Sequence, residues 1–184
     1  MARSSKRIQL LESAAHIVNE QGIEYLTLDA VAKRAGVSKG GLLYHFNNKA
    51  ALIQGLVTYA DELYRTNVNG HKAVQTEQQG KLIRAFIEAT REHRKENASI
   101  TSGMLAAQGT NSNLLLPLQE TYKSWQSEIE NDGLDEIDAT IYRLAVDGLW
   151  LSEIFGIDAI DEKMRQDVLN LSLIHISEPT RQEA

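Results

Sequence analysis

The chain of 184 residues has no cysteine, only two prolines and no long apolar run. Without cysteine, disulfide frameworks, thiolate metal sites and cysteine nucleophiles are excluded. The apolar runs are far shorter than the ~20 residues that a membrane-spanning helix needs. The basic start MARSSKRIQL also lacks the apolar core of a secretion signal. We therefore expect a cytoplasmic protein with no membrane partner.

Alternation of polar and apolar residues, which is the pattern of a half-buried strand, is almost absent from the chain. Apolar residues instead recur at helical spacing throughout. The hydrophobic content of 42% is ordinary for a globular protein with a real core. The sequence therefore predicts an all-α fold of helices joined by short turns.

The net charge of −6 is divided unevenly along the chain. Residues 1–50 carry seven Lys and Arg against four Asp and Glu, a net +3, so residues 51–184 carry −9. A basic head on an acidic body can place its positive charge against phosphate groups. Chance clustering is the alternative, so charge alone does not identify the partner.

The first 50 residues predict three helices and the start of a long fourth. Apolar residues at helical spacing over 5–21 predict the first helix, and Gly22 follows as its end. Thr27 is suited to cap a second helix and Ser38 to cap a third of about seven residues. Gly36 lies in the turn between them.

Two adjacent glycines, Gly40 and Gly41, open the third helix, although each costs up to ~1 kcal/mol relative to alanine in a helix interior. The segment TLDAVAKRAGVSKGGLLYHF has the helix-turn-helix layout, whose second helix enters the major groove of DNA. Missing side chains at its leading end let the backbone approach DNA, and Lys39 can reach a phosphate or a guanine edge. The segment therefore predicts DNA binding; two accidental glycines in a frayed helix end are the alternative.

The longer segment TLDAVAKRAGVSKGGLLYHFNNKAALI resembles the DNA-binding region of the TetR/AcrR family of bacterial transcriptional repressors, over about residues 8–56. The shared pattern combines T-x-x-x-V-A-x-x-A-G-V-S with Y-H-F and a following lysine. The resemblance implies a homodimer with a three-helix head at 1–49 and a linking helix over about 49–68. An antiparallel helical domain for ligand binding and dimerisation would occupy 70–170. It also implies a repressor that binds a palindromic double-stranded DNA operator and is released by a small-molecule effector, without a cofactor. An activator and a regulator without an effector are the alternatives.

The resemblance assigns roles by position. Thr27 and Lys49 would contact phosphates, and Tyr44 with His45 would anchor the helix end on the sugar-phosphate backbone. Many relatives have an aromatic residue where Leu43 stands, so either a hydroxyl contact to phosphate is missing or Leu43 packs on a thymine methyl group. The full set of predicted DNA-binding residues is Thr27, Ser38, Lys39, Gly40, Gly41, Leu43, Tyr44, His45 and Lys49.

The stretch GLDEIDATIYRLAVDGLWLSEIFG, residues 133–156, is similar to the last-but-one helix of one subgroup of small TetR-like regulators, where it lies at the dimer interface. Its apolar arc is wide, which predicts burial on two sides, one of them against a second copy of the chain. By analogy, the effector would bind between the long helices. For each candidate residue, ordinary core packing or solvent exposure is the alternative. The candidates are His93, Met104, Tyr122, Trp125, Asp147 and Trp150.

No catalytic or metal-binding constellation is evident. Ser13 and His16 lie one helical turn apart but lack an acid that would orient the imidazole. The histidines lack metal-ligand spacing. We therefore expect neither an enzyme nor a metal site. A module that binds protein through its first three helices is the remaining alternative. The salt dependence of binding distinguishes the two, because DNA binding weakens steeply between about 50 and 200 mM salt.

The stretch LSLIHISEPTR, residues 171–181, turns to a strand-like run and a proline. It resembles, codon for codon, the translation of a transposon-end adaptor used in sequencing libraries. We therefore expect residues 171–184 to be non-native and the native sequence to end near Asn170, which would shorten the last helix of the dimer interface. A long read of the intact locus that contains this tail would contradict the expectation.

Overall fold

The computed structural model describes residues 5–92, 103, 106–157 and 159–177. Every regular element in these ranges is a helix, so the prediction of an all-α fold is confirmed. The chain forms two compact units, one of residues 1–63 with 95–121 and one of residues 64–94 with 122–184. None of the helices within the described ranges is long and apolar enough to cross a membrane.

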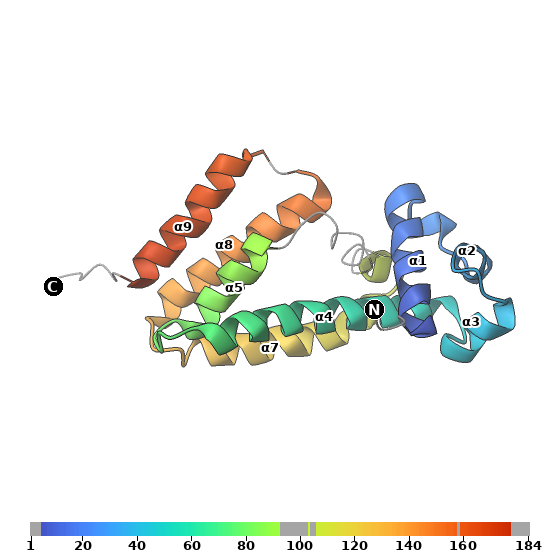
Figure 1. Cartoon of the computed structure of the whole chain (residues 1–184), viewed down its shortest axis with the longest axis horizontal. Coiled ribbons are helices and arrows are strands. Elements are labelled where there is room, and N and C mark those ends of the chain that lie inside the picture. Colours follow the sequence, from blue (N-terminus) through green and yellow to red (C-terminus); the bar gives the residue numbers. More distant parts are fainter. Residues whose placement is uncertain (1–4, 93–102, 104–105, 158, 178–184) are drawn as a thin grey trace. The chain divides into compact units, whose positions relative to one another are not determined.

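The first unit contains the helix-turn-helix. Figure 1 shows its first helices packed together beside the first turns of α4. A helical stretch at 106–110 belongs to the same unit, and Ala106 and Ala107 are buried in its core. The elements are α1 (Lys6–Gln21), the 3-10 helix η1 (Ile23–Tyr25), α2 (Leu28–Arg34), α3 (Lys39–His45), the start of α4 (Lys49–Val74), the 3-10 helix η2 (Ser112–Leu115) and the start of α7 (Leu116–Ile129).

The predicted helix caps of the first unit are confirmed. The Thr27 hydroxyl accepts a hydrogen bond from the backbone N–H of Ala30 at 3.1 Å, and the Ser38 hydroxyl accepts one from Gly41 at 3.1 Å. Each cap satisfies a backbone donor that would otherwise lack a partner in the first turn. Gly36 adopts a φ of +65°, which favours glycine, and it makes the turn between α2 and α3.

The core of the first unit places α4 close to the end of α3. A Cβ atom added to Gly55 of α4 would lie 2.7 Å from Cε1 of Phe46, the residue that ends α3, and 3.1 Å from Cδ2 of Leu11. Both partners are buried. Protein interiors are packed to the density of organic crystals, so no space exists there for another methyl group.

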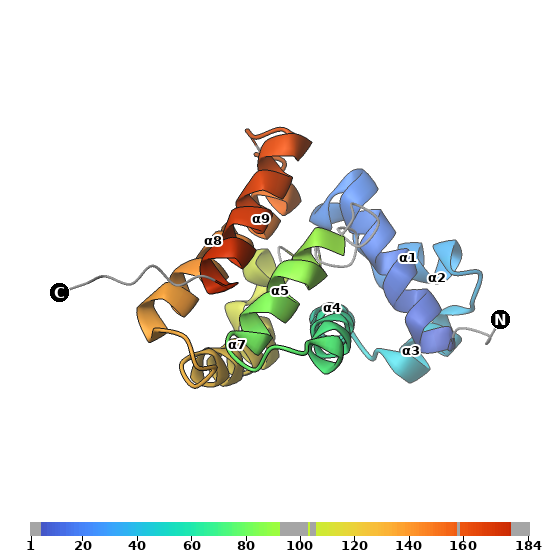
Figure 2. The same ribbon diagram turned by 60° about the vertical axis from the view of Figure 1, so that its left-hand side comes forward.

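The second unit is built from the later part of α4, most of α7 and three further helices. Figure 2 shows α5, α8 and α9 side by side. The cluster of buried side chains draws on all five helices and includes Val68, Phe86, Ile129, Val146 and Leu169. The three further helices are α5 (Lys81–Glu92), α8 (Glu136–Phe155) and α9 (Glu162–Ser177).

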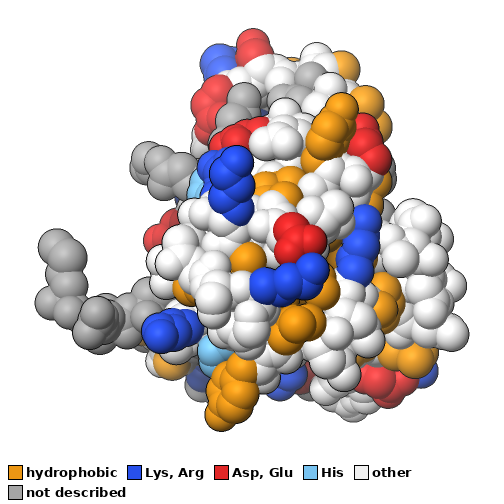
Figure 3. All heavy atoms as spheres, turned by 90° about the vertical axis from the view of Figure 1, so that its right-hand side faces the viewer, with side chains coloured by type: hydrophobic (Ala, Val, Ile, Leu, Met, Phe, Trp, Pro, Cys, Tyr) orange, Lys and Arg blue, Asp and Glu red, His pale blue; other side chains and the backbone are white. Residues whose placement is uncertain are grey.

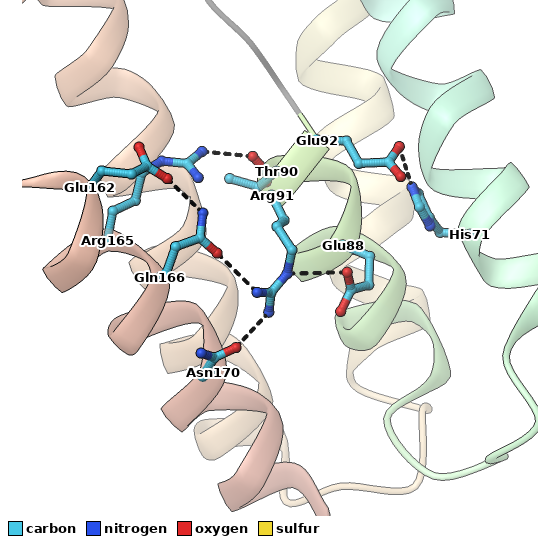
Figure 4. Close-up of polar contacts among 9 residues, drawn as sticks. All are labelled: His71, Glu88, Thr90, Arg91, Glu92, Glu162, Arg165, Gln166 and Asn170. Carbon is cyan, nitrogen blue, oxygen red and sulfur yellow. Dashed lines mark hydrogen bonds and ion pairs between the residues drawn. The ribbon is translucent and has the colours of Figure 1, made fainter.

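Two arginines fasten α9 to the end of α5 (Figure 4). Arg165 is buried, donates to the backbone carbonyl of Thr90 at 2.7 Å, and forms an ion pair with Glu153 of α8. Arg91 of α5 donates to the side chains of Gln166 and Asn170 on α9 at 2.9 and 3.0 Å. These contacts join the last turn of α5 to residues 165–170 of α9.

Helix α8 has two apolar faces. Its core face carries Val146 and Trp150, which are buried. The opposite face carries large apolar side chains that are 43–65% exposed in the single chain. We call this second face the α8 ridge; it consists of Ile137, Ile141, Leu144 and Leu151.

The strand-like interpretation of the tail is wrong for its described part, because α9 continues to Ser177. Leu169, Leu173 and Ile176 follow helical spacing and pack in the core of the second unit. Packing against that core overrides the β propensity of the short Ile-rich run. The expectation that this segment is non-native is a separate matter and stays a prediction, and residues 178–184 lie outside the described residues.

Candidate nucleic-acid interface and effector site

The residues predicted to bind DNA lie on the exposed side of α3 and on the two segments beside it. Tyr44 is 86% exposed and Leu43 is 40% exposed, whereas their neighbour Leu42 is buried in the core. Figure 3 views the side of the first unit that carries α2 and α3, where exposed Lys and Arg side chains lie beside Asp or Glu side chains and among apolar and uncharged groups.

The fold does not require glycine at position 40 of α3, whereas Gly41 lies close to the hydroxyl that caps the helix. Neither has a positive φ. A Cβ atom on Gly40 would meet no atom within 4 Å, and one on Gly41 would lie 3.3 Å from the Ser38 hydroxyl oxygen. The helix is continuous from Lys39 through both positions, which does not support the frayed-end interpretation. The bare surface at Gly40 is therefore unexplained by packing within the chain.

Each lysine in the predicted set has a partner within the first unit. The Lys39 ammonium lies 3.0 Å from Oδ1 and 3.1 Å from Oδ2 of Asp29 on α2. The Lys49 ammonium donates to the backbone carbonyl of Ile23 at 3.2 Å. The pairing of Asp29 with Lys39 could not be read from the sequence, because that contact spans the turn between two helices.

Tyr44 and His45 form a pair at the end of α3. Their ring centroids lie 5.1 Å apart in an edge-to-face arrangement, and His45 is half-buried beside Phe46. The phenol of Tyr44 thus projects into solvent, while its ring contacts the half-buried His45. An exposed phenol can donate a hydrogen bond to a phosphate oxygen.

In the second unit, four helices bring aromatic rings into contact. Tyr64 of α4 stacks on Trp150 of α8 at 6.0 Å between ring centroids and lies edge-on to Trp125 of α7 at 5.7 Å. Phe86 of α5 contacts Trp125 at 4.7 Å, and Tyr122 of α7 contacts it at 5.6 Å. Burial raises the pKa of the Tyr64 and Tyr122 phenols well above the ordinary value. We call these five residues the aromatic cluster.

Asp147 of α8 lies buried beside this cluster with two partners. The Tyr122 hydroxyl donates to Oδ1 at 3.2 Å, and the Arg143 guanidinium donates to Oδ2 at 2.6 Å. Arg143 also donates to the Gln126 side chain at 2.9 Å. Burial raises the pKa of the Asp147 carboxyl, although the Arg143 charge opposes that shift. The pair is neutral overall when the carboxyl is ionised.

Four of the six residues predicted to bind an effector therefore come together, namely Tyr122, Trp125, Asp147 and Trp150. The other two, His93 and Met104, lie outside the described residues. Sequence reasoning missed Tyr64, Phe86 and Arg143. The spacing of four between Arg143 and Asp147 on one helix was a usable signal. No such signal pointed to Tyr64 and Phe86, because they lie on helices distant in the sequence from α7 and α8.

Comparison with known proteins matches both parts of the chain to family profiles. Residues 10–56 match the profile described as bacterial regulatory proteins, tetR family, and residues 80–171 match the profile described as tetracyclin repressor-like, C-terminal domain. The HTH-type transcriptional regulator TtgR of Pseudomonas putida is 37% identical over 71 residues, which are 39% of this chain and 32% of TtgR.

Solved structures share the fold over nearly the whole chain. A transcriptional regulator from Rhodococcus sp. Rha1 is 22% identical with a TM-score of 0.70, over 94% of this chain and 96% of that one. The multidrug binding protein EbrR complexed with malachite green is 22% identical with a TM-score of 0.63, over 91% and 98%. At such identity the likeness concerns the fold.

Proposed function

Because the chain belongs to the TetR family of bacterial regulatory proteins, we propose that it is a DNA-binding transcriptional regulator of the cytoplasm. It represses its targets by binding a palindromic operator as a homodimer, and a small-molecule effector releases it. The observation that carries this proposal is the exposed face of α3, whose leading turn is bare at Gly40 although nothing in the fold requires glycine there.

On this proposal, α3 enters the major groove with its first turn leading. The backbone at Gly40 and Gly41 approaches bases or phosphates, and Lys39 contacts a phosphate or a guanine edge. Tyr44 and His45 hold the sugar-phosphate backbone. Thr27 and Ser38 use their hydroxyl oxygens as helix caps, and each hydroxyl hydrogen can still be donated to a phosphate.

The decisive experiment selects bound sequences from random duplex DNA with the full chain. We expect an enriched inverted repeat whose half-sites lie one helical turn, about 34 Å, apart, because each protomer of a dimer presents one recognition helix. Binding should weaken steeply between about 50 and 200 mM salt. Recovery of no preferred sequence at low salt, or an affinity independent of salt, would overturn the proposal in favour of a protein partner.

Variants of α3 test its orientation on that selected duplex. Gly40→Ala adds a methyl group to open space, so the fold should tolerate it while DNA affinity falls at least tenfold through a steric clash. Tyr44→Ala should weaken binding through loss of a phosphate contact, with unchanged thermal unfolding. Tyr25→Ala, which removes another exposed tyrosine of the first unit, is the matched control. Unchanged affinity in both α3 variants would count against the proposed orientation.

The effector site that we propose is the aromatic cluster with Asp147. Flat aromatic compounds suit it, because they can replace the stacking of Tyr64 on Trp150 with their own. An effector shifts the protein between states only by its difference in affinity for them, typically about 1 to 3 kcal/mol. The same compound must therefore bind the DNA-bound protein more weakly than the free protein, by that difference.

Calorimetric titration with a panel of neutral and cationic aromatic compounds tests this site. Malachite green is a suitable first probe, because the EbrR structure contains it. A compound that binds should weaken DNA binding, and Tyr122→Phe should change its affinity through the Asp147 hydrogen bond. Tyr59→Phe, a half-buried tyrosine of the first unit, serves as the control. A compound that releases DNA but binds Tyr122→Phe and wild type equally would place the site elsewhere.

A further inference from the structure

A carboxylate lies on the surface that the proposed function places against a polyanion. Asp29 is in the first turn of α2, two residues after the cap Thr27, and its side chain is 70% exposed. Its two oxygens hold the ammonium group of Lys39, the first residue of α3, at 3.0 and 3.1 Å. The pair therefore joins the leading ends of the two helices of the helix-turn-helix.

We propose that Asp29 is an internal competitor of DNA for Lys39, and that it sets how strongly the head binds. This inference rests on the proposed function, since it concerns the same surface. In the free protein, Lys39 is paired with Asp29. On DNA, Lys39 leaves that carboxylate for a phosphate or a guanine edge, and the unpaired Asp29 then faces the negatively charged duplex.

The surroundings of the pair support an exchange of partners. Both side chains are largely exposed, so the ion pair is solvated and holds Lys39 only weakly. Contacts between a lysine and a phosphate release counterions from the duplex, which favours the DNA-bound arrangement at low salt. The Arg34–Glu20 pair on the same unit differs, because two parallel hydrogen bonds of 2.7 and 2.8 Å hold it in a fixed fork.

A purely local role for Asp29 is the alternative interpretation. A carboxylate in the first turn of a helix interacts favourably with the helix dipole, and this interaction alone would justify its presence in α2. On that view, Lys39 could keep Asp29 as its partner in the complex with DNA. The two views predict opposite couplings between Asp29 and Lys39, so a double-mutant cycle separates them.

The experiment measures the affinity of four full-length proteins for a fluorescein-labelled duplex of the sequence that wild type enriches. They are wild type, Asp29→Asn, Lys39→Met and the double variant. If Asp29 competes for Lys39, Asp29→Asn should raise affinity about three- to tenfold when Lys39 is present. It should raise affinity about two- to fivefold less in the Lys39→Met background, where no pair exists to break. For Asp29→Asn, the fall of log affinity with log salt concentration should steepen by up to about the amount expected for one additional phosphate contact.

Glu12→Gln is the matched control, because it removes one exposed negative charge from α1 of the same unit without touching Lys39. It should change affinity less than twofold. Circular dichroism of each variant checks that α2 is intact. A gain from Asp29→Asn that is equal or larger in the Lys39→Met background, or no gain at all, would overturn the inference while leaving DNA binding by wild type in place. If wild type binds no duplex, both the proposed function and this inference are wrong.

Discussion

Two glycines of α4 have opposite surroundings. Gly55 faces Phe46 and Leu11 at distances that leave no space for a methyl group, whereas a Cβ atom on Gly70 would meet nothing within 4 Å. Alanine has the higher helix propensity by up to ~1 kcal/mol, so propensity alone would favour alanine at both positions. Packing therefore decides how an alanine substitution at Gly55 changes the free energy of unfolding, and helix propensity decides this at Gly70.

We predict that Gly55→Ala lowers the free energy of unfolding by about 1 to 2 kcal/mol, because overpacking costs more than the propensity gain. Gly70→Ala, in the same helix, should raise it by up to ~1 kcal/mol. Urea unfolding followed by circular dichroism measures both. Stabilisation by Gly55→Ala would mean that Phe46 can move aside, and that the end of α3 is less fixed than its packing indicates.

The buried phenols of Tyr64 and Tyr122 predict a loss of stability in alkali. Burial raises both pKa values, so the folded chain keeps two protons that the unfolded chain releases from about pH 10 upward. The unfolded state gains from that release, and the free energy of unfolding therefore falls as pH rises above about 10. Each retained proton contributes a slope of up to ~1.4 kcal/mol per pH unit.

Urea unfolding between pH 8.5 and 11 tests this prediction with a matched pair of variants. Tyr64→Phe removes one of the two phenols and should reduce the alkaline slope. Thr90→Val removes the same 3.2 Å hydrogen bond but leaves the phenol in place, so it should keep the slope of wild type. An equal slope in Tyr64→Phe and wild type would show that this phenol is not protected in the folded chain.

At the scale of elements, Arg165 links α9 to both α5 and α8. Replacing it by methionine leaves the Glu153 carboxylate and the Thr90 carbonyl without their partner, and we expect a loss of about 1 to 3 kcal/mol in the free energy of unfolding. The estimate is below the full value for a buried pair because Glu153 is partly exposed.

Lys163→Met is the matched change for this prediction. Lys163 is highly exposed and pairs with Asp167 on its own helix, so its loss should alter stability by no more than about 0.5 kcal/mol. Thermal unfolding of both variants makes the comparison. Similar effects in the two would mean that α9 is held by its apolar side chains alone.

The elements that could be predicted from the sequence are those governed by local signals. Thr27, Gly36 and Ser38 act within four residues of their own positions, and each was assigned correctly. The pairing of Asp29 with Lys39 could not be predicted, because it depends on the angle between α2 and α3. Similarly, the meeting of Tyr64 with Trp150 depends on how helices distant in the sequence pack.

The prediction for the end of α9 was wrong for a related reason. Residues 171–177 have strand-like composition, yet Leu173 and Ile176 complete a face that begins at Leu169 and is buried in the core. Only the presence of that core makes the helical conformation preferable. Propensity is a weak guide wherever a short segment finds a well-matched surface to cover.

At the scale of the whole molecule, the α8 ridge favours a dimer. Ile137, Ile141, Leu144 and Leu151 alternate spacings of four and three when Gly148 is counted between the last two, which is the pattern of a coiled-coil seam. A Cβ atom on Gly148 would meet nothing within 4 Å of its own chain, so a second helix can approach there.

We predict that Ile141→Glu, which places a charge in the ridge, weakens the dimer at least a hundredfold in sedimentation equilibrium. Val74→Glu is the control, since Val74 is 73% exposed but lies at the end of α4, away from the ridge residues in the sequence. A dimer that survives Ile141→Glu unchanged would assign the interface to another surface. DNA affinity should fall in parallel with dimer affinity, because two heads hold one operator.

The chain has two tryptophans, Trp125 and Trp150, and both lie in the second compact unit. Indole emission therefore follows the melting of that unit alone, whereas far-ultraviolet dichroism follows the helices of both. In a denaturant titration, coincident midpoints for the two signals would indicate that the two cores melt as one cooperative system, and separate midpoints would indicate that they melt independently. The placement of two indole rings thus makes the cooperativity of the whole chain measurable without any label.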